Sequence, residues 1–220
     1  MKQAFEKVKQ NPLFQGIGVS DFETMLACME ARLQHYQKGT IIQLSGNPVE
    51  SIGLVLSGVV QVVREDLEGK QNLLTELREE DMFGEVFACA GITHSPVTVV
   101  AEETSEVLHI NYRKIITTCT SACAFHHQLV ANMLTLLAQK NLMLNRKIEV
   151  LSRRTIRERL LLYFDLYRQG AKRFTIPLSR EELAAYLCVD RSAMSAELSK
   201  MQREGLLRYE RNTFEMTEEK

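Results

Sequence analysis

Residues 179–207 read SREELAAYLCVDRSAMSAELSKMQREGLL and contain two short helical patterns joined by Cys188-Val189-Asp190. Ser179 and Glu182 form a capping box, which predicts a helix that begins at Arg180. Asp190 is a favourable N-cap for the second helix. Apolar residues spaced along both helices would pack them together, namely Leu183, Ala184, Leu187, Val189, Met194, Leu198 and Met201.

The outward face of the second helix carries small or basic side chains at Arg191, Ser192, Ser195 and Ala196. Such side chains can enter a groove, and the pattern is typical of a helix-turn-helix, whose second helix lies in the major groove of DNA. The alternative is an ordinary helical hairpin within a core, because paired short helices are common.

The composition is that of a globular chain, with 45% hydrophobic and 25% charged residues among 220. This length is enough for one or two domains with sizeable cores. No apolar run approaches the roughly 18 residues that span a bilayer, and the N-terminal MKQAFEKVKQ lacks the hydrophobic region of a signal peptide. We therefore expect a cytoplasmic protein without a membrane partner.

Charge is distributed unevenly along the chain. Residues 1–152 carry 13 Lys/Arg and 17 Asp/Glu, a balance of −4, whereas residues 153–220 carry 14 and 11, a balance of +3. A positive C-terminal part suits contact with phosphates, through an effect that is independent of sequence and sensitive to salt.

Apolar periodicity divides the first half of the chain into two parts. Residues 4–36 have helical spacing and are expected to form short covering helices. From Lys38 onward the period is two, with glycines at the turns. Short strands at regular spacing predict a small β-barrel or sandwich of the jelly-roll type. The expected strands are Thr40–Leu44, Ser51–Leu56, Val59–Arg64, Asn72–Leu77, Val97–Ala101 and Glu106–Ile110.

The helical period returns after Ile110 and continues to Leu151. A helix this long carries more apolar surface than one small β-domain can cover, so we expect it to pair with its copy in a second subunit. The alternative is packing against the chain's own domains. The predicted dimer-interface residues are Val130, Met133, Leu137, Asn141, Leu144, Ile148 and Leu151.

The C-terminal part is predicted to be a winged helix-turn-helix. Ser152-Arg153-Arg154 is expected to form a hinge, followed by an amphipathic helix over Ile156–Tyr167 and a short strand at Phe174–Pro177. Leu206–Tyr209 and Thr213–Met216 flank a two-residue turn and predict a hairpin wing. The predicted class is α+β, with a β-roll domain over residues 1–118, a long dimerisation helix over 119–152 and the winged domain over 153–220.

Three segments extend the argument to a family. KGTIIQLSG, SIGLVLSGVVQVV and EDMFGE occur in this order before the helix-turn-helix, and together they resemble the cyclic-nucleotide-binding β-roll of the CRP/FNR superfamily of transcription regulators. The resemblance covers nearly the whole chain. It implies a homodimer that binds double-stranded DNA, with RNA polymerase as a further partner if the protein is an activator.

The position of each residue in the helix-turn-helix predicts the DNA contacts. Ser179 and Arg180 begin the first helix, where backbone N–H groups and a cation favour phosphate. Arg191 can bond bidentately to guanine. The remaining candidates are Ser192 and Ser195, and also Lys200 and Arg211, which are either backbone contacts or solvated charges.

The resemblance also limits what operator to expect. The family commonly reads bases with an Arg, a Glu and a second Arg, and the corresponding residues here are Arg191, Ser192 and Ala196. We therefore do not expect the half-site of the cyclic-AMP receptor branch. Cys188 replaces a residue that is often Gly, which predicts a positive φ in the turn.

The same comparison argues against cyclic AMP as the effector. In members that bind cyclic nucleotides, a Gly-Glu pair meets the ribose, as Gly84-Glu85 could here, and a downstream Arg and Ser hold the phosphate. The corresponding residues are Ser95 and Pro96, which supply no cation. Leu144 and Asn145 stand where Thr and Ser contact adenine. Another small effector could occupy a pocket lined by Phe83, Phe87, Val97 and Leu144.

Cysteine and histidine usage gives little support for a bound metal. The cysteines 28, 89, 119, 123 and 188 form no CxxC pair, and an iron–sulfur sensor of this superfamily needs a cysteine cluster near the N-terminus. Cys119 and Cys123 are more easily read as two small buried side chains. A haem would need a ligand among His94, His109, His126, His127 and Cys89, but a lone histidine is more often a surface or core residue.

Three functions remain in competition. The favoured one is a homodimeric, sequence-specific transcription regulator. It would bind a roughly palindromic operator with an affinity that a small effector sets. The second is a DNA binder that needs no ligand and has a vestigial β-roll. An enzyme is disfavoured, because the sequence offers no phosphate-binding glycine loop, metal spacing or Ser/His/Asp arrangement.

Overall fold

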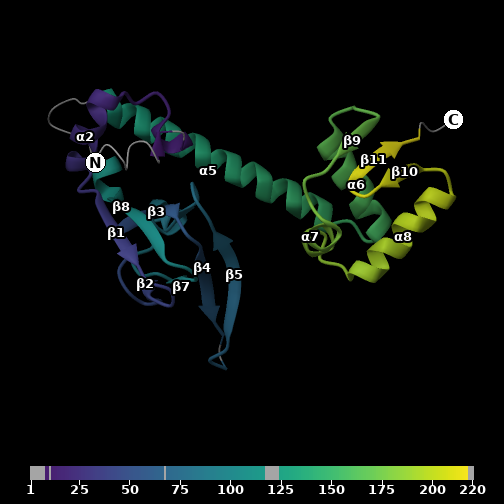
Figure 1. Cartoon of the computed structure of the whole chain (residues 1–220), viewed down its shortest axis with the longest axis horizontal. Helices are drawn as coiled ribbons and strands as arrows, with labels where there is room; N and C mark the ends of the chain where they lie inside the picture. The colour runs from purple at the N-terminus through teal and green to yellow at the C-terminus, as the bar shows by residue number, and fades with distance from the viewer. Residues whose placement is uncertain (1–7, 10, 67, 117–123, 218–220) are drawn as a thin grey trace. The chain divides into compact units, whose positions relative to one another are not determined.

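The computed structural model describes residues 8–9, 11–66, 68–116 and 124–217, with residues 19, 20 and 124 described by their backbone alone. The chain divides into two compact units, Met1–Ala138 and Gln139–Lys220. The boundary falls inside the long helix α5 (Ala124–Leu151), so each half of this helix belongs to a different unit (Figure 1). The predicted start of this helix at residue 119, and Cys119 and Cys123, lie outside the described residues.

The first unit contains two antiparallel four-stranded sheets, ordered β1-β8-β3-β6 and β2-β7-β4-β5. Every strand expected from the period-two pattern is present, and each of its bounds agrees to within one residue. The strands are β1 (Arg32–Tyr36), β2 (Ile41–Gln43), β3 (Ser51–Ser57), β4 (Val60–Glu65), β5 (Gln71–Leu77), β6 (Met82–Phe83), β7 (Thr98–Ala101) and β8 (Ser105–Asn111).

Strand β3 explains how the first unit is packed. Its apolar run is buried on both faces, because successive side chains point in opposite directions. Ile52 and Leu54 join a core with the helices, whereas Val55 joins a second core of Val60, Phe83, Val99 and Val107. This second core holds side chains from both sheets, which is the arrangement of a β-roll.

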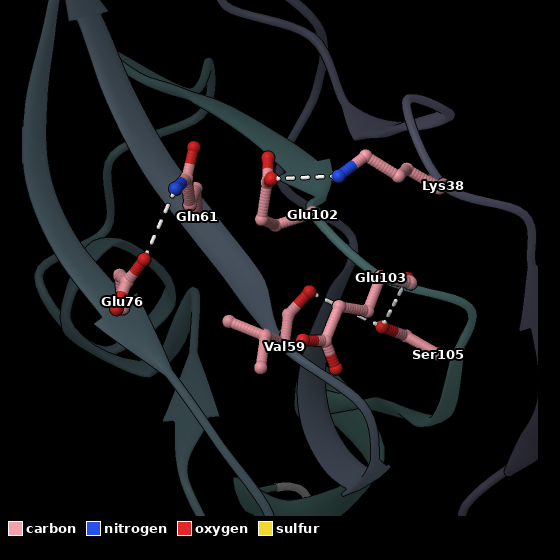
Figure 2. Close-up of polar contacts among 7 residues, drawn as sticks. All are labelled: Lys38, Val59, Gln61, Glu76, Glu102, Glu103 and Ser105. Carbon is pink, nitrogen blue, oxygen red and sulfur yellow. Dashed lines mark hydrogen bonds and ion pairs between the residues drawn. The ribbon is translucent and has the colours of Figure 1, made fainter.

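A hydroxyl and a glycine fix the turn between β3 and β4. The Ser105 hydroxyl donates to the carbonyl oxygens of Val59 at 3.2 Å and Glu103 at 2.8 Å (Figure 2). Gly58 has φ +84°, and a Cβ there would lie 2.4 Å from the Ser105 oxygen, so only glycine fits. In the loops nearby, Lys38 pairs with Glu102 at 2.9 Å (Figure 2).

Short helices cover the first core. They are the 3₁₀ turn η1 (Pro12–Phe14), α2 (Val19–Cys28), α3 (Glu85–Cys89) and α4 (Tyr112–Ile116), together with the N-terminal half of α5. The helical spacing predicted for residues 4–36 is wrong at its end, because residues 32–36 form β1 beside β8. Strand β6 and helix α3 were not expected from the sequence, whereas α4 lies where the helical period was predicted to return after Ile110.

The second unit follows the winged helix-turn-helix pattern. After α5 come α6 (Ile156–Arg168), β9 (Arg173–Thr175), α7 (Arg180–Tyr186), α8 (Arg191–Arg203), β10 (Leu207–Glu210) and β11 (Thr213–Met216). The three strands form a sheet in the order β10-β11-β9. All seven apolar residues predicted to join the two helices lie in or against one buried cluster, which confirms that packing.

Among the helices that the structure describes, none combines the length and the apolar character needed to cross a bilayer.

Candidate nucleic-acid interface

Asp190 determines where the reading helix α8 begins. Its carboxylate accepts hydrogen bonds from the backbone N–H groups of Ser192 at 2.8 Å and Ala193 at 3.0 Å, as expected of an N-cap. The Ser192 hydroxyl and these amides hold the pKa of the Asp190 carboxyl below its usual range. The carboxylate therefore stays charged at the positive end of the helix dipole.

The exposed face of α8 holds the predicted reading residues. Arg191, Ser192 and Ala196 are exposed, and Ser195 is half-buried. The Ser192 hydroxyl donates to Asp190, and the Ser195 hydroxyl donates to the Arg191 carbonyl at 2.8 Å. Both hydroxyls can still accept a hydrogen bond, so both remain able to contact a donor in a DNA groove.

Arg191 is an exposed cation of this face, and it has an acidic neighbour. Its guanidinium lies 3.2 Å from the carboxylate of Glu181 on α7, with 62% and 73% of the two side chains exposed. An ion pair this open to solvent contributes little to stability. Arg191 can therefore exchange Glu181 for another hydrogen-bond acceptor at small cost.

Arg180 has a different environment from the one its sequence position suggests. Its guanidinium stacks 4.7 Å from the Tyr209 ring and 5.0 Å from the Phe214 ring, and it donates to the Arg211 carbonyl at 2.9 Å. Burial lowers the pKa of Arg180. Nη1 is buried without a hydrogen-bond partner. Arg180 thus ties the first helix to the wing, and its predicted phosphate contact stays a prediction.

The other predicted contacts are exposed at the edge of the motif. Ser179 caps α7, its hydroxyl accepting from the Glu182 N–H at 3.2 Å, and the complete capping box confirms the predicted helix start. Lys200 and Arg211 are both exposed. Arg211 lies in the two-residue turn of the wing with φ 51°, between paired Glu210 and Thr213.

An ion-pair clamp fixes α8 against α6. Arg157 on α6 reaches Glu197 at 2.6 Å and Glu204 at 2.7 Å. These two carboxylates raise the pKa of Arg157. Arg157 thus holds Glu197 on α8 and Glu204 directly after α8. Two points of attachment limit the rotation of α8 about its own axis.

A groove beside the wing was not foreseen from the sequence. It is lined by Ala196, Ser199, Gln202 and Arg203 of α8 and by Tyr209 of β10. These α8 residues continue the exposed face one and two turns beyond Ser192 and Ser195. Ala196 and Ser199 lie four residues after those serines, and Gln202 and Arg203 lie three and four residues after Ser199, so helical spacing was the signal that could have identified them.

The effector residues predicted in the β-roll are mostly buried. Phe83 joins the core between the sheets, and Gly84 adopts φ +81° as the N-cap of α3, which begins with the buried Glu85. Val97 is buried, Phe87 packs against the first core, and Pro96 is exposed. Leu144 and Asn145 are exposed and belong to the second unit.

Ser95 occupies the position at which the resemblance expects a phosphate-binding cation. Its side chain is buried, and its hydroxyl donates to the Val97 carbonyl at 2.7 Å while it accepts from the Val97 N–H at 3.3 Å. The Ser95 N–H donates to the Asn47 carbonyl at 2.8 Å. The polar groups of Ser95 are therefore used within its own loop and by the neighbouring loop at residues 45–47.

The predicted dimer residues divide between the two units. Met133 is buried, and Val130 and Leu137 pack against the first unit's own core, as the alternative reading of the helix supposed. Leu151 is half-buried. Asn141, Leu144 and Ile148 are exposed, the last two at 60% and 64%. Large exposed apolar side chains thus cluster in the C-terminal half of α5, at Leu142, Met143, Leu144 and Ile148, whereas Leu134 is the corresponding exposed residue of the N-terminal half.

Groups that could bind a metal are scattered. Within the described ranges, His, Cys, Asp and Glu side chains nowhere gather in threes that could hold an ion. His109 is held by Tyr36 at 2.9 Å and Ser51 at 3.3 Å, and burial lowers its pKa to about 4. His126 Nε2 lies 3.2 Å from the Lys114 carbonyl and 3.9 Å from the Cys28 sulfur. Cys89 and His94 are exposed, as is His127.

Known proteins resemble this chain along most of its length. The model of the cyclic nucleotide-binding domain matches residues 33–121, and that of the Crp-like helix-turn-helix domain matches residues 158–219. The cyclic AMP receptor protein of Thermus thermophilus is 27% identical over 212 residues, which are 96% of this chain and 94% of the relative. The CRP-like cAMP-activated global transcriptional regulator of Mycobacterium tuberculosis is 26% identical over 207 residues, covering 90% and 88%.

A solved structure supports the fold. The crystal structure of DNR from Pseudomonas aeruginosa aligns with a TM-score of 0.55 at 18% identity, covering 99% of this chain and 95% of the other. The β-roll, long helix and winged helix-turn-helix thus occur together in a known protein in the same order.

Proposed function

Because the chain belongs to the CRP/FNR family and is a DNA-binding transcription regulator, we propose that it acts as a homodimer on a roughly palindromic operator, under the control of a small effector other than cyclic AMP. A protein that binds an operator would act in the cytoplasm, where the DNA is. If it activates transcription, RNA polymerase would be a further partner. An enzymatic activity forms no part of the proposal.

The observation that carries the proposal is the exposed N-terminal turn of α8. Asp190 caps this turn, and Arg191 projects from it with an easily exchanged partner. The first turn of the second helix approaches base edges in this motif. Arg191 is therefore proposed to read guanine. The contact would be extended by other residues of the exposed face of α8, namely Ser192, Ser195, Ser199, Gln202 and Arg203.

Two further observations support the dimer and the choice of effector. Leu144 and Ile148 leave an apolar face uncovered on α5, and pairing with a second α5 would bury it. Both relatives named above carry cyclic AMP in their names, but Ser95 and Pro96 here offer no cation for a cyclic phosphate.

The test is selection of bound duplexes from a random library by the full-length protein. We expect an inverted repeat whose half-sites are about one helical turn apart. Affinity for the selected operator should fall steeply with added salt, because phosphate contacts release counterions. Titration calorimetry with cyclic AMP should give no saturable heat. Recovery of no consensus would contradict sequence-specific binding, and tight binding of cyclic AMP would contradict the choice of effector.

A further inference from the structure

One cavity in the second unit shares no lining residue with the predicted DNA contacts. Its volume is about 340 Å³, which lies within the size range of small-molecule sites. Side chains from three helices form its wall. They are Met143, Arg146 and Lys147 of α5, Tyr163 and Tyr167 of α6, and Tyr186 of α7.

Three tyrosines form the aromatic part of this wall. The Tyr163 ring lies 5.1 Å from that of Tyr186 and stacks on Tyr167 at 6.1 Å with an interplanar angle of 19°. Within the described part of the chain, none of the three hydroxyls makes a hydrogen bond. Burial raises the pKa of Tyr163 to about 12, so its hydroxyl remains a donor at neutral pH. The wall thus offers ring faces and unused O–H groups.

The same wall carries two positive charges. Lys147 Nζ lies 5.3 Å from the centre of the Tyr186 ring. Neither Arg146 nor Lys147 forms an ion pair with a carboxylate among the residues that the structure describes. Two cations beside an apolar wall, with no carboxylate among the described residues that line the cavity, complement an anion that has an apolar body.

The cavity and the predicted dimer face lie on different sides of α5. Met143 and Lys147 are four residues apart and share one side of the helix. Ile148 is turned about 100° away from Lys147. Leu144 lies at the border and contributes to both. A second copy seated on Ile148 would therefore leave the side of Met143 and Lys147 open.

We propose that this cavity binds a small aromatic carboxylate, with the ring against the tyrosines and the carboxylate beside Arg146 and Lys147. Its regulatory consequence rests on the proposed function. α5 precedes the connection at residues 152–155, whereas α6 and α7 follow it, and Tyr186 ends α7 directly before the turn of the helix-turn-helix. A ligand that touches all three helices would favour one arrangement of this connection, by as much as its affinity differs between arrangements.

Titration calorimetry of the full-length protein tests the site. The probes are benzoate, 1-naphthoate and phenylacetate, each beside its neutral carboxamide. We expect saturable binding of one carboxylate per chain, weakened about tenfold in the carboxamide, because the charge-assisted contacts are lost. Arg146→Gln and Lys147→Gln should weaken the carboxylate similarly. Lys140→Gln, two turns earlier on the same helix, is the matched control and should not.

Four outcomes would overturn the proposal. One is that no carboxylate saturates the protein below about 1 mM, a weak affinity for a site that offers three aromatic rings and two cations. Another is equal binding of acid and carboxamide, and the third is unchanged binding by Lys147→Gln. If Met143→Trp, which should fill the cavity, instead dissociates a dimer, the cavity belongs to a second copy of the chain. Operator binding measured on the same samples separates the two proposals. If the protein binds the carboxylate but no operator, only the proposed function is contradicted.

Discussion

Cys188 is the residue at which the turn of the helix-turn-helix is most constrained. Its φ is 51°, as predicted from the glycine that it replaces, and the hydrogen bonds of the turn close around it, from Cys188 N–H to Ala185 at 3.1 Å and from Val189 N–H to Ala184 at 3.0 Å. A side chain in this left-handed conformation crowds its own backbone. The turn is therefore kept by its neighbours against the preference of the residue itself.

We predict that Cys188→Gly unfolds at higher urea concentration than Cys188→Ala, by about 1 kcal/mol in the free energy of unfolding. The alanine variant is the matched control, because both variants remove the thiol and only glycine relieves the backbone. Equal stability of the two would mean that the turn relaxes when the side chain changes.

Arg191 is the residue on which base recognition depends in our proposal. Arg191→Ala should weaken binding to the selected operator by about 1–3 kcal/mol and relax the preference at one base pair, whereas Lys200→Ala should weaken all duplexes alike and reduce the salt slope by about one. Binding assays over a set of single-base operator variants distinguish the two patterns. A uniform loss from Arg191→Ala would instead assign this residue to phosphate.

At the scale of the element, the start of α8 depends on one carboxylate. The pKa of Asp190 is lower in the folded protein than in the unfolded chain, mainly through the Ser192 hydroxyl. The stabilisation is therefore fully present above the unfolded pKa of about 4 and is lost as the pH falls through the folded pKa. Asp190→Asn keeps a cap but removes this titration.

The stability advantage of the natural protein over Asp190→Asn should accordingly shrink as the pH falls from 7 to 3, measured by urea denaturation at each pH. Introducing Ser192→Ala into both proteins should reduce this dependence, because the largest cause of the pKa shift is removed. A difference that does not change with pH would show that the carboxylate does not stabilise the helix.

The elements that could be predicted from the sequence are those decided by residues close together in the chain. The capping box of Ser179, the Asp190 cap and the two-residue wing turn are each decided by side chains within a few residues, and all are confirmed. Strand β1 was missed because its pairing with β8 joins residues about seventy positions apart, and its own burial pattern shows no alternation. The dual packing of α5 depends on both units and could not follow from its period alone.

At the scale of the whole molecule, self-association should depend on the side of α5 that carries Leu144 and Ile148. We expect Ile148→Asp to shift the protein from dimer to monomer in sedimentation velocity, because the carboxylate would be buried at the interface. Leu142→Asp is the matched control. Leu142 is similarly exposed, at 57% against 64%, but lies about 120° around the helix and should leave the dimer intact.

Two results would contradict this arrangement. A natural protein that sediments as a monomer would remove the dimer from the proposal. Dissociation by Leu142→Asp but not by Ile148→Asp would place the interface on the opposite side of the helix. Operator affinity should fall together with dimer formation, since one half-site offers only half of the contacts.

The carboxylates around Arg191 also affect how the protein would travel along a chromosome. Glu181 lies 3.2 Å from Arg191, and Asp190 precedes it in the chain. Every duplex presents phosphates, and these repel both carboxylates, so a random site attracts this surface less than its arginines alone would. If Arg191 reads guanine as proposed, a correctly placed guanine would give it a better partner than Glu181. The protein would then stay briefly on wrong sequences and longer on the right one, which would shorten the search for a target.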